Sequence, residues 1–242
     1  MSTWGRPSVL QVTDLRAGYG STPVLTGVNL KVGEGEVVAL MGRNGMGKTT
    51  LLRTVMGLLP ARGGSIRWKG GQEISKLPTH LRARLGLGYV PQGRDIFPGL
   101  TVRENLRLGG MAAGHDGTRQ LEDVLALFPM LSEKLSARGA SLSGGQQQLL
   151  ALARALVAGP KVLLLDEPSE GIQPSILEQI VERIRTINRQ EGIAVLLVEQ
   201  NIQFAAALAD RAYIMTKGVV VRELPMARIV DDPEIQREYM GV

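Results

Sequence analysis

One glycine-rich stretch organises this chain: Gly42-Arg43-Asn44-Gly45-Met46-Gly47-Lys48-Thr49-Thr50. It fits the pattern of a glycine, four residues and Gly-Lys-Thr, which is that of a phosphate-binding loop, or P-loop. A short apolar run suited to a buried strand, Glu36 to Met41, precedes it, and apolar residues at helical spacing follow from Thr50 to Met56. Glycines let backbone N–H groups point into one concavity, and the start of a helix adds positive charge there. We therefore predict a strand, a phosphate-binding turn and a helix.

Two side chains of this loop have expected contacts with a bound nucleotide. Lys48 should reach the β- and γ-phosphates as a point charge, and the Thr49 hydroxyl should bind Mg²⁺. The predicted phosphate-binding surface is the whole loop: Gly42, Arg43, Asn44, Gly45, Met46, Gly47, Lys48, Thr49 and Thr50. The alternative is a glycine-rich turn that matches the pattern by chance, and the strand before it and the helix after it argue against that alternative.

A second apolar run ends in two acids: Val162-Leu163-Leu164-Leu165-Asp166-Glu167. It is typical of a buried parallel strand, and ligand sites in open α/β sheets lie at the carboxyl ends of such strands. We expect Asp166 to hold the P-loop Mg²⁺ through its shell and Glu167 to polarise an attacking water. The alternative is a strand end with two solvated acids.

A third motif, Leu142-Ser143-Gly144-Gly145-Gln146, predicts the start of a helix that ends near Gly159. Ser143 is a good N-cap, and Gln146 stands three residues later, as in a capping box. Because the N-terminus of a helix binds anions, this would be a second anion site in the chain. A well-capped helix without a ligand is the alternative. Thr101 and Glu104 predict another capping box.

Composition limits the class of protein. The 242 residues suffice for one large α/β domain, and 44% hydrophobic with 21% charged residues is ordinary for a globular protein. The absence of cysteine excludes disulfides, thiol chemistry and cysteine–zinc sites, and it suits a reducing cytoplasm. The net charge of +5 could favour binding to nucleic acid or to an anionic membrane surface. A basic surface that is simply solvated explains the scattered basic residues equally well. Residues 1–7 lack the apolar core of a signal peptide, and no apolar run is long enough to span a membrane.

The rest of the chain predicts alternating strands and helices. Strands are expected at 9–12, 24–32, 65–68, 88–92 and 194–198, and helices at 80–84, 174–190 and 205–209, with a hairpin near 217–218 and a short helix at the C-terminus. Residues 93–140 look like a helical insert between sheet strands. Tyr19 lies in the turn after the first strand, where its ring could stack on a purine base or simply fill the turn.

Together these motifs resemble those of the ATP-binding subunits of ATP-binding-cassette (ABC) transporters, over nearly the whole chain. In that family the P-loop is the Walker A motif, the acidic strand end is Walker B, Leu142 to Gln146 is the signature, and Gln92 stands in the Q-loop. The resemblance implies an α/β fold, an ABC-type P-loop NTPase domain with a mixed core sheet, an N-terminal antiparallel β subdomain and a helical signature subdomain. One domain would span residues 1–242, with the catalytic core and β subdomain in 8–92 and 160–242 and the helical subdomain in 93–159.

The resemblance also implies ligands and the residues that bind them. The cofactors would be ATP and Mg²⁺, and the metal-binding residues would be Thr49, Gln92 and Asp166. The catalytic residues would be Glu167, Gln200 and Gln92. Two such domains would pair head to tail, so that each ATP lies between the P-loop of one and Ser143, Gly144, Gly145 and Gln146 of the other. Tyr19 matches the aromatic residue that stacks on adenine in this family.

Two positions depart from the general family pattern. Gln200 stands where the family has a switch histidine, and the only histidines of the chain are His80 and His115. Gln173 stands at the position of the D-loop aspartate. Gln200 could contact the γ-phosphate or the attacking water as a neutral donor, or it could cap the helix that begins near Asn201.

Both departures resemble one subfamily, which contains the second ATPase of branched-chain amino acid importers and its relative in urea and short-chain amide importers. The implied function is an ATP-hydrolysing subunit that energises a membrane importer, for branched-chain amino acids first and for urea or short amides as the alternative. Its partners would be transmembrane permease subunits, a second ABC ATPase in a homo- or heterodimer and, indirectly, a periplasmic solute-binding protein. It would be cytoplasmic and peripheral on the inner membrane.

Two rival classes follow from the same motifs. A soluble, nucleic-acid-linked cassette ATPase would also be basic, but such proteins usually carry two cassettes or a long coiled-coil insertion, and this chain has neither. No nucleic acid is therefore expected as a partner. A P-loop GTPase would need an Asn-Lys-x-Asp motif to read its base, and the sequence contains none.

Overall fold

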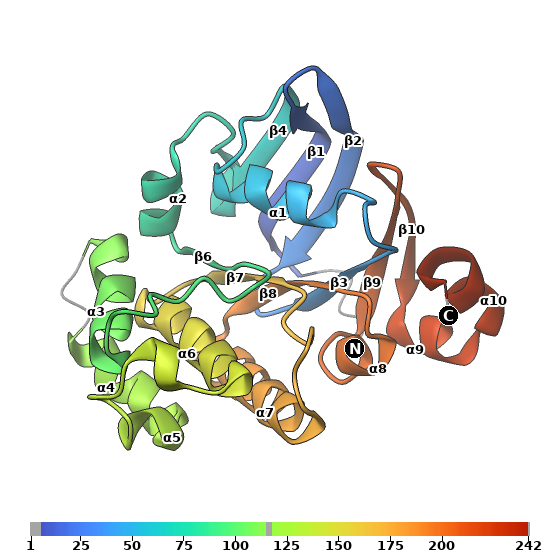
Figure 1. Cartoon of the computed structure of the whole chain (residues 1–242). Helices are drawn as coiled ribbons and strands as arrows, with labels where there is room; N and C mark the ends of the chain where they lie inside the picture. The colour runs from blue at the N-terminus through green and yellow to red at the C-terminus, as the bar shows by residue number, and fades with distance from the viewer. Residues whose placement is uncertain (1–5, 115–117, 242) are drawn as a thin grey trace.

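Two β-sheets and the helices packed on them make up the computed structural model, which describes residues 6–114 and 118–241 (Figure 1). The larger sheet has the strand order β10 (Val219–Pro225), β9 (Arg211–Thr216), β3 (Val37–Met41), β8 (Ala194–Glu199), β7 (Val162–Asp166) and β6 (Leu87–Val90). Its strands pair in parallel except β9 with β10, which pair antiparallel. The predicted mixed core sheet is thus confirmed.

The smaller sheet is antiparallel, in the order β2 (Thr22–Gly33), β1 (Ser8–Tyr19), β4 (Gly63–Trp68) and β5 (Gln72–Glu73). The first strand is much longer than the predicted 9–12. Thr13 and Asp14 are both exposed, Asp14 has a φ of 46°, and the register with β2 shifts between Val12 and Leu15. This bulge breaks the alternation of buried and exposed residues, so the sequence pattern ended there although the strand continues.

The P-loop helix α1 (Lys48–Met56) lies between the two sheets (Figure 1). It buries Leu51, Leu52 and Val55 in a core cluster shared with both sheets. On β3 successive residues point to opposite faces: Leu40 joins this cluster, whereas Met41 joins the cluster on the other face. Because β3 is buried on both faces, the P-loop that follows it begins from a rigid strand.

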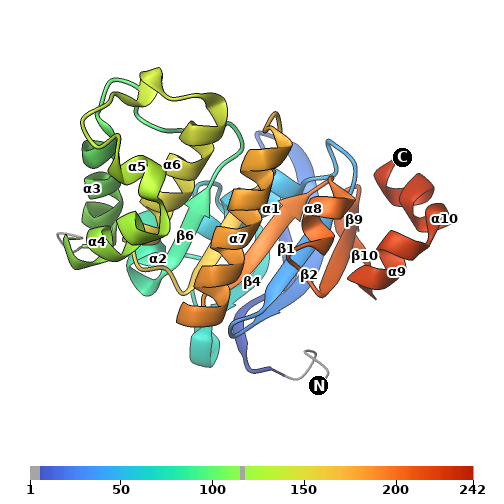
Figure 2. The ribbon, with the colours of Figure 1, turned by 90° about the horizontal axis from the view of Figure 1, so that it is seen from below.

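Helices cover the opposite face of the core sheet (Figure 2). They are α6 (Gly144–Val157), α7 (Pro174–Glu191) and α8 (Ile202–Ala206). α3 (Val102–Ala113) and α4 (Thr118–Leu127) pack on α6, and α5 (Pro129–Ser132) packs on α4. Both predicted capping boxes are present, Thr101 with Glu104 at α3 and Ser143 with Gln146 at α6. α3 and α6 approach closely at Gly109, where a Cβ would lie 2.1 Å from the carbonyl oxygen of Arg154.

A buried arginine holds the carboxyl end of the P-loop helix. Arg82 lies in α2 (Thr79–Leu85) and is 2% exposed. Its guanidinium donates to the carbonyl oxygens of Thr54 at 2.8 Å and Val55 at 2.7 Å, in the last turn of α1, and to those of Ser75 and Leu77. A cation at this end of a helix also interacts favourably with its dipole. α2 thus fixes α1, and with it the P-loop, against the antiparallel sheet.

Some element bounds differ from those predicted. The helix expected at 205–209 begins at Ile202, because the Asn201 side chain caps it. The C-terminal helix is divided into α9 (Met226–Asp231), α10 (Pro233–Ile235) and a short π-helix at Gln236–Met240. His80 lies in α2, whereas His115 and residues 1–5 fall outside the described residues. Within the described part, every helix is too short or too polar to cross a bilayer.

Candidate functional site

The P-loop joins β3 to α1 at the carboxyl edge of the core sheet. Its glycines have positive φ angles of 151° at Gly42, 77° at Gly45 and 102° at Gly47. A Cβ on Gly42 would lie 2.4 Å from the carbonyl oxygen of Met215, so only glycine fits there. The loop therefore depends on glycine for its path and for its contact with β9, as a phosphate cradle requires.

The P-loop lysine meets the second Walker B acid. Lys48 is only 4% exposed, and its Nζ lies 3.3 Å from Glu167 Oε1 and donates to the carbonyl oxygens of Gly42 and Arg43 at 2.7 and 3.0 Å. Glu167 has a φ of 47°, in the left-handed region that few residues other than glycine adopt. Its N–H donates to the carbonyl oxygen of Val198 at 2.9 Å. Pairing with β8 thus holds Glu167 in an unfavourable backbone conformation beside the lysine.

The first Walker B acid is buried beneath the P-loop. Asp166 is 1% exposed, and it accepts from the Thr49 hydroxyl at 3.0 Å on Oδ1 and from the Tyr89 hydroxyl at 3.2 Å on Oδ2. Burial raises the pKa of Asp166, and these two hydrogen bonds oppose that shift. Burial next to this carboxylate also raises the pKa of Tyr89, which keeps its phenol protonated as a donor. The site thus brings a hydroxyl and a carboxylate together, as predicted for Thr49 and Asp166.

These oxygen donors suit Mg²⁺ in a P-loop. No cluster of three or more His, Cys, Asp or Glu side chains suited to a metal occurs in the described ranges. Mg²⁺ in nucleotide sites is commonly held by one or two protein oxygens together with substrate phosphates and water. The pair of Thr49 and Asp166 fits this pattern, and the triphosphate would supply further ligands.

Two glutamines complete the surroundings of Glu167. Gln200 Nε2 donates to Glu167 Oε1 at 3.1 Å and to Oδ1 of Asn44 in the P-loop at 2.6 Å. Gln92 Nε2 lies 3.3 Å from Glu167 Oε2 and donates to Glu170 at 2.8 Å. Three segments distant in sequence therefore converge on one carboxylate, and the predicted catalytic residues lie together.

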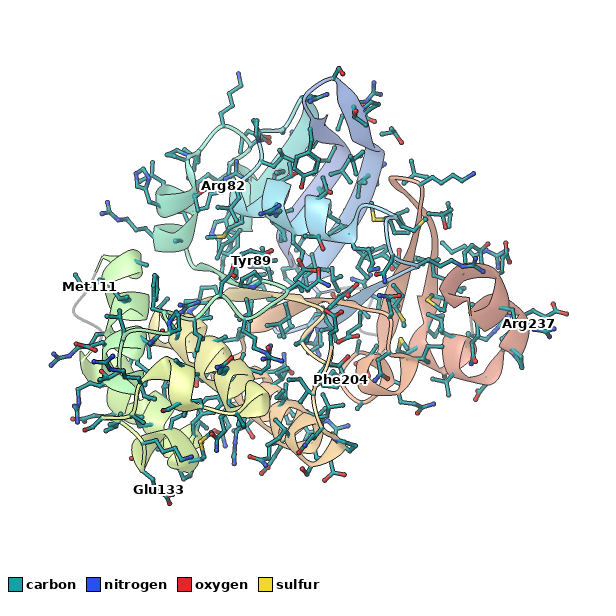
Figure 3. The ribbon with its side chains drawn as sticks, viewed as in Figure 1. Arg82, Tyr89, Met111, Glu133, Phe204 and Arg237 are labelled. Atoms are coloured by element: carbon teal, nitrogen blue, oxygen red, sulfur yellow. The ribbon has the colours of Figure 1, made fainter. Side chains whose placement is uncertain are left out.

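The alternative function of Gln200 as a helix cap is wrong. The residue that caps α8 is Asn201, whose side-chain oxygen accepts from the N–H of Phe204 at 3.0 Å. Figure 3 shows Phe204 in this region of the molecule. The amide of Gln200 is turned instead toward Asn44 and Glu167, so its neighbours are P-loop and Walker B residues.

A pocket of about 350 Å³ lies over the P-loop. It is lined by Val24, Asn44, Gly45, Gly47, Lys48, Thr49, Thr50, Gln92 and Glu167. Tyr19 lies outside this lining, 45% exposed at the end of β1, and its hydroxyl raises the pKa of the Arg53 guanidinium in α1. Arg62 donates to the carbonyl oxygens of Gly18 and Gly20 and so holds the turn that contains Tyr19. Stacking of Tyr19 on adenine stays a prediction.

Two P-loop side chains turn away from the predicted phosphate position. The Arg43 guanidinium donates to the carbonyl oxygen of Arg237, in the C-terminal segment, at 2.8 Å. Figure 3 shows Arg237 on the C-terminal helices beside β10. Met46 accepts from the N–H of Lys217 through Sδ at 3.3 Å and from that of Gly218 through its carbonyl. These side chains fix the loop to its surroundings, and only their backbones remain available for phosphate.

The signature residues lie apart from this pocket. The signature residues Ser143, Gly144, Gly145 and Gln146 form the start of α6, where Ser143 is exposed and the other three are partly buried. As the described residues place them, none lines the P-loop pocket. The Arg94 guanidinium lies against Gly144, where a Cβ would come within 2.9 Å of Nη1. An arginine beside a helix N-terminus adds positive charge to a potential anion site. The P-loop and the start of α6 thus lie at separate places on one chain, and anion binding at each stays a prediction.

Three residues of the site were missed from the sequence. Tyr89 binds Asp166, Arg94 lies at the signature helix, and Glu199 is buried at the end of β8, next to Walker B. Glu199 was detectable, because it is an acid at the carboxyl end of an apolar strand, the same signal that identified Asp166. Tyr89 and Arg94 gave no such signal, since their partners come from other parts of the chain.

Known proteins resemble this chain along most of its length. A family model described as ABC transporter matches residues 25–170. The chain is 45% identical over 224 residues to the high-affinity branched-chain amino acid transport ATP-binding protein BraG of Pseudomonas aeruginosa, covering 92% of this chain and 95% of BraG. It is 36% identical over 239 residues to the lipopolysaccharide export system ATP-binding protein LptB of Escherichia coli K12, covering 97% and 98% of the two chains.

A solved structure extends the comparison to an assembled state. The chain is similar to a dimeric ATP-binding cassette in a post-hydrolysis state bound to ADP and Pi, with a TM-score of 0.79 and 26% identity. The superposition covers 90% of this chain and 98% of that one.

Proposed function

This chain belongs to the ABC transporter family, and we propose on this basis that it is the ATP-hydrolysing subunit that energises a membrane importer of branched-chain amino acids. The observation that supports the catalytic part most strongly is the meeting of Lys48, Gln200 and Gln92 at the Glu167 carboxylate. A lone P-loop would bind phosphate, whereas a carboxylate held beside its lysine can also act on water.

Each residue of the site has a defined task in this proposal. The P-loop N–H groups and the Lys48 ammonium bind the β- and γ-phosphates, and Thr49, Asp166 and Gln92 would hold Mg²⁺. Bound Mg²⁺ would neutralise phosphate charge as it develops in the transition state. Glu167 orients and polarises the attacking water, and Gln200 donates its amide to the water or to a γ-phosphate oxygen. Tyr19 supports the adenine ring.

A second cassette completes the site in the proposed assembly. Ser143 to Gln146 lie outside the P-loop pocket, so within one chain they have no phosphate to bind. In a head-to-tail pair they would face the nucleotide held by the partner's P-loop. Arg94 would add a cation on the same side. The dimeric cassette structure supports this pairing, in a homodimer or with a second ATPase of the importer.

An apolar groove between the core sheet and the helical segment is the proposed docking surface for the permease. The groove, of about 560 Å³, contains the exposed side chains of Leu58, Phe97 and Met111, which are 53%, 47% and 66% exposed. Figure 3 labels Met111 near the end of α3 and Tyr89 on β6, and both residues line this groove. The hydroxyl of Tyr89 donates to Asp166 of Walker B. A permease segment seated in the groove would therefore contact Tyr89, which in turn contacts Walker B.

The solute is proposed from similarity alone, because this chain does not contact it in such an assembly. Identity of 45% with BraG, against 36% with LptB, favours branched-chain amino acid import over lipopolysaccharide export. Urea and short amides remain the alternative within import. On the proposed assembly, the chain would be peripheral on the cytoplasmic face of the inner membrane.

The test is to purify the chain with its associated membrane proteins and to measure ATP hydrolysis in liposomes. We expect permease subunits and a solute-binding protein to co-purify, and we expect leucine with that binding protein to stimulate hydrolysis. Stimulation by urea instead would move the assignment to the amide branch. Stimulation by DNA or RNA, without any permease, would contradict the transport function.

A further inference from the structure

A buried acid, Glu199, stands at the carboxyl end of β8. It is 2% exposed, and its carboxylate accepts three backbone N–H groups. Oε1 accepts from Ser169 at 3.0 Å, and Oε2 accepts from Gln200 at 3.0 Å and from Asn201 at 3.1 Å. One carboxylate therefore satisfies donors from two different loops, which its two oxygens make possible.

Each of these loops contains a residue of the proposed catalytic site. Ser169 follows Glu167 by two residues, in the loop after β7, and Gln200 is the first residue after β8. β7 and β8 are neighbours in the sheet, with Asp166 opposite Val198. Glu199 thus bridges the two loops through their backbones, while Gln200 bridges them through its side-chain bond to Glu167 at 3.1 Å.

We propose that Glu199 is a positioning residue for ATP hydrolysis, which sets the distance between Gln200 and Glu167 by binding the backbones of both loops. This inference rests on the proposed ATPase function and adds to it a residue that touches no substrate. Without the bridge, the loop that contains Gln200 would lose its contact with Ser169 of the Walker B loop through Glu199. The bond from the Glu167 N–H to Val198 and the side-chain hydrogen bond of Gln200 would remain. A misplacement of the order of 1 Å suffices to lower turnover strongly.

Burial of Glu199 supports this assignment. Burial raises its pKa, and the hydrogen bonds from Ser169, Asn201 and Gln200 oppose that shift. The hydrogen-bond partners of the carboxylate are therefore backbone N–H groups, in a position where solvent has little access. A glutamine in its place has one acceptor oxygen, and its NH₂ group would face an N–H donor. Glu199→Gln should consequently release one of the two loops while it preserves side-chain volume.

The experiment measures ATP turnover by the assembled importer for Glu199→Gln and Glu199→Asp, alone and each combined with Gln200→Ala. We expect either single variant to lower kcat about tenfold or more, with little change in KM for ATP. Because Glu199 acts through Gln200, its variants should lower kcat by less than about twofold in the Gln200→Ala background. A merely structural acid would lower the amount of folded protein and leave the kcat of the folded fraction unchanged.

Glu36→Gln is the matched control. Glu36 is also a buried carboxylate, 4% exposed, and it accepts from the N–H of Gly33 at 2.8 Å and pairs with Arg211 at 2.7 Å. It precedes β3 and so lies at the edge of the sheet opposite the P-loop. We expect Glu36→Gln to lower the melting temperature and to leave kcat per folded molecule unchanged.

Two results would overturn the inference. One is a kcat equal to that of the parent in both Glu199 variants. The other is a double variant whose fold decrease in kcat equals the product of the decreases in the Glu199 variant and in Gln200→Ala. If the parent complex hydrolyses no ATP, the proposed function fails and this inference fails with it. If the parent hydrolyses ATP and the Glu199 variants have the same kcat as the parent, this inference fails and the proposed function stands.

Discussion

At the scale of single residues, the proposed function rests on the groups that meet the Glu167 carboxylate. Oε1 lies within reach of Lys48 Nζ and Gln200 Nε2, and Oε2 lies near Gln92 Nε2. A carboxylate among three donors has a fixed orientation, which is what positioning of a water requires. The site has a neutral amide, that of Gln200, at the position where the resemblance to the family predicts a titratable histidine.

Gln200 should matter for turnover more than for ATP affinity. Gln200→Ala removes one donor to the transition state, so kcat should fall about tenfold or more, the scale of about 1.5–3 kcal/mol for a hydrogen bond to a charged group. Gln200→His should retain activity and gain a pH dependence between about pH 6 and 7, since imidazole titrates there. Steady-state hydrolysis across pH, with ATP affinity measured separately, checks both.

Asn201→Ala serves as the control for that variant. Its side chain caps α8, so its loss should lower stability by about 1 kcal/mol. Thermal melting should therefore decrease, while kcat per folded molecule stays near that of the parent. If Gln200→Ala instead behaves like Asn201→Ala, the amide of Gln200 has no catalytic function.

Asp166 should lower the stability of the protein at neutral pH. Burial raises its pKa above the unfolded value of about 3.9, so the folded state binds a proton more tightly than the unfolded state. Parental stability therefore falls as the pH rises from about 4 through the raised pKa. Asp166→Asn removes this cost and should melt higher than the parent at pH 7, by a margin that shrinks toward pH 4, while hydrolysis is lost. An equal margin at both pH values would refute this linkage.

At the scale of elements, the start of α6 combines a cap with a potential anion site. Ser143 accepts from the N–H of Gln146 and closes a capping box. Aspartate caps helices as well as serine does and suits the helix dipole, but it would bring a negative charge to the partner's phosphates. Ser143→Asp should therefore keep the melting temperature and lose ATP hydrolysis by the assembled dimer. Thr101→Asp, the same change at the cap of α3, should keep hydrolysis per folded molecule, although its melting temperature should fall because aspartate cannot donate to Glu104 as the Thr101 hydroxyl does.

Loss of hydrolysis in both cap variants would indicate a general effect of the added charge. Normal hydrolysis in Ser143→Asp would remove the signature helix from the nucleotide site. Measurement of melting and phosphate release on the same preparations separates these results.

Local sequence patterns predicted the elements whose partners lie close in sequence. Both capping boxes join residues three apart, so Thr101 and Ser143 could be assigned before the structure. The same holds for the acids at the end of β7, because four apolar residues precede them. The first strand was predicted too short, since the bulge at Asp14 interrupts its alternation.

The contacts between distant segments could not be predicted. Ser169 could be recognised as the partner of Glu199 only once β7 and β8 were known to be neighbours in the sheet. Tyr89 reaches Asp166 only because β6 lies beside β7. Arg43 was expected to bind nucleotide as part of the P-loop pattern, and its guanidinium lies instead on the C-terminal segment. In each case tertiary pairing, which no local window contains, sets the contact.

At the scale of the whole molecule, Asp166 links the apolar groove to the pocket over the P-loop, because it accepts from Tyr89, which lines the groove, and from Thr49, which lines the pocket. Met111→Glu places a charge on the exposed rim of the groove, so it should block association with the permease and leave the fold unchanged. Val221→Glu is the control, since Val221 is also exposed, at 45%, but lies in β10. Co-purification of the permease with each variant is the measurement. Retention of the permease by Met111→Glu would place its docking surface elsewhere.

The most direct measurement is ATP turnover and ATP binding by Glu167→Gln, beside Lys48→Ala and the exposed control Glu133→Gln, each assembled with the partner ATPase. If Glu167 activates water beside the P-loop lysine, Glu167→Gln should bind ATP, form an ATP-held dimer on size-exclusion chromatography and lose about a hundredfold or more in turnover. Lys48→Ala should lose tight binding as well, and Glu133→Gln should match the parent. Parental turnover by Glu167→Gln, or full activity of Lys48→Ala, would contradict the assignment of this site as the one that hydrolyses ATP.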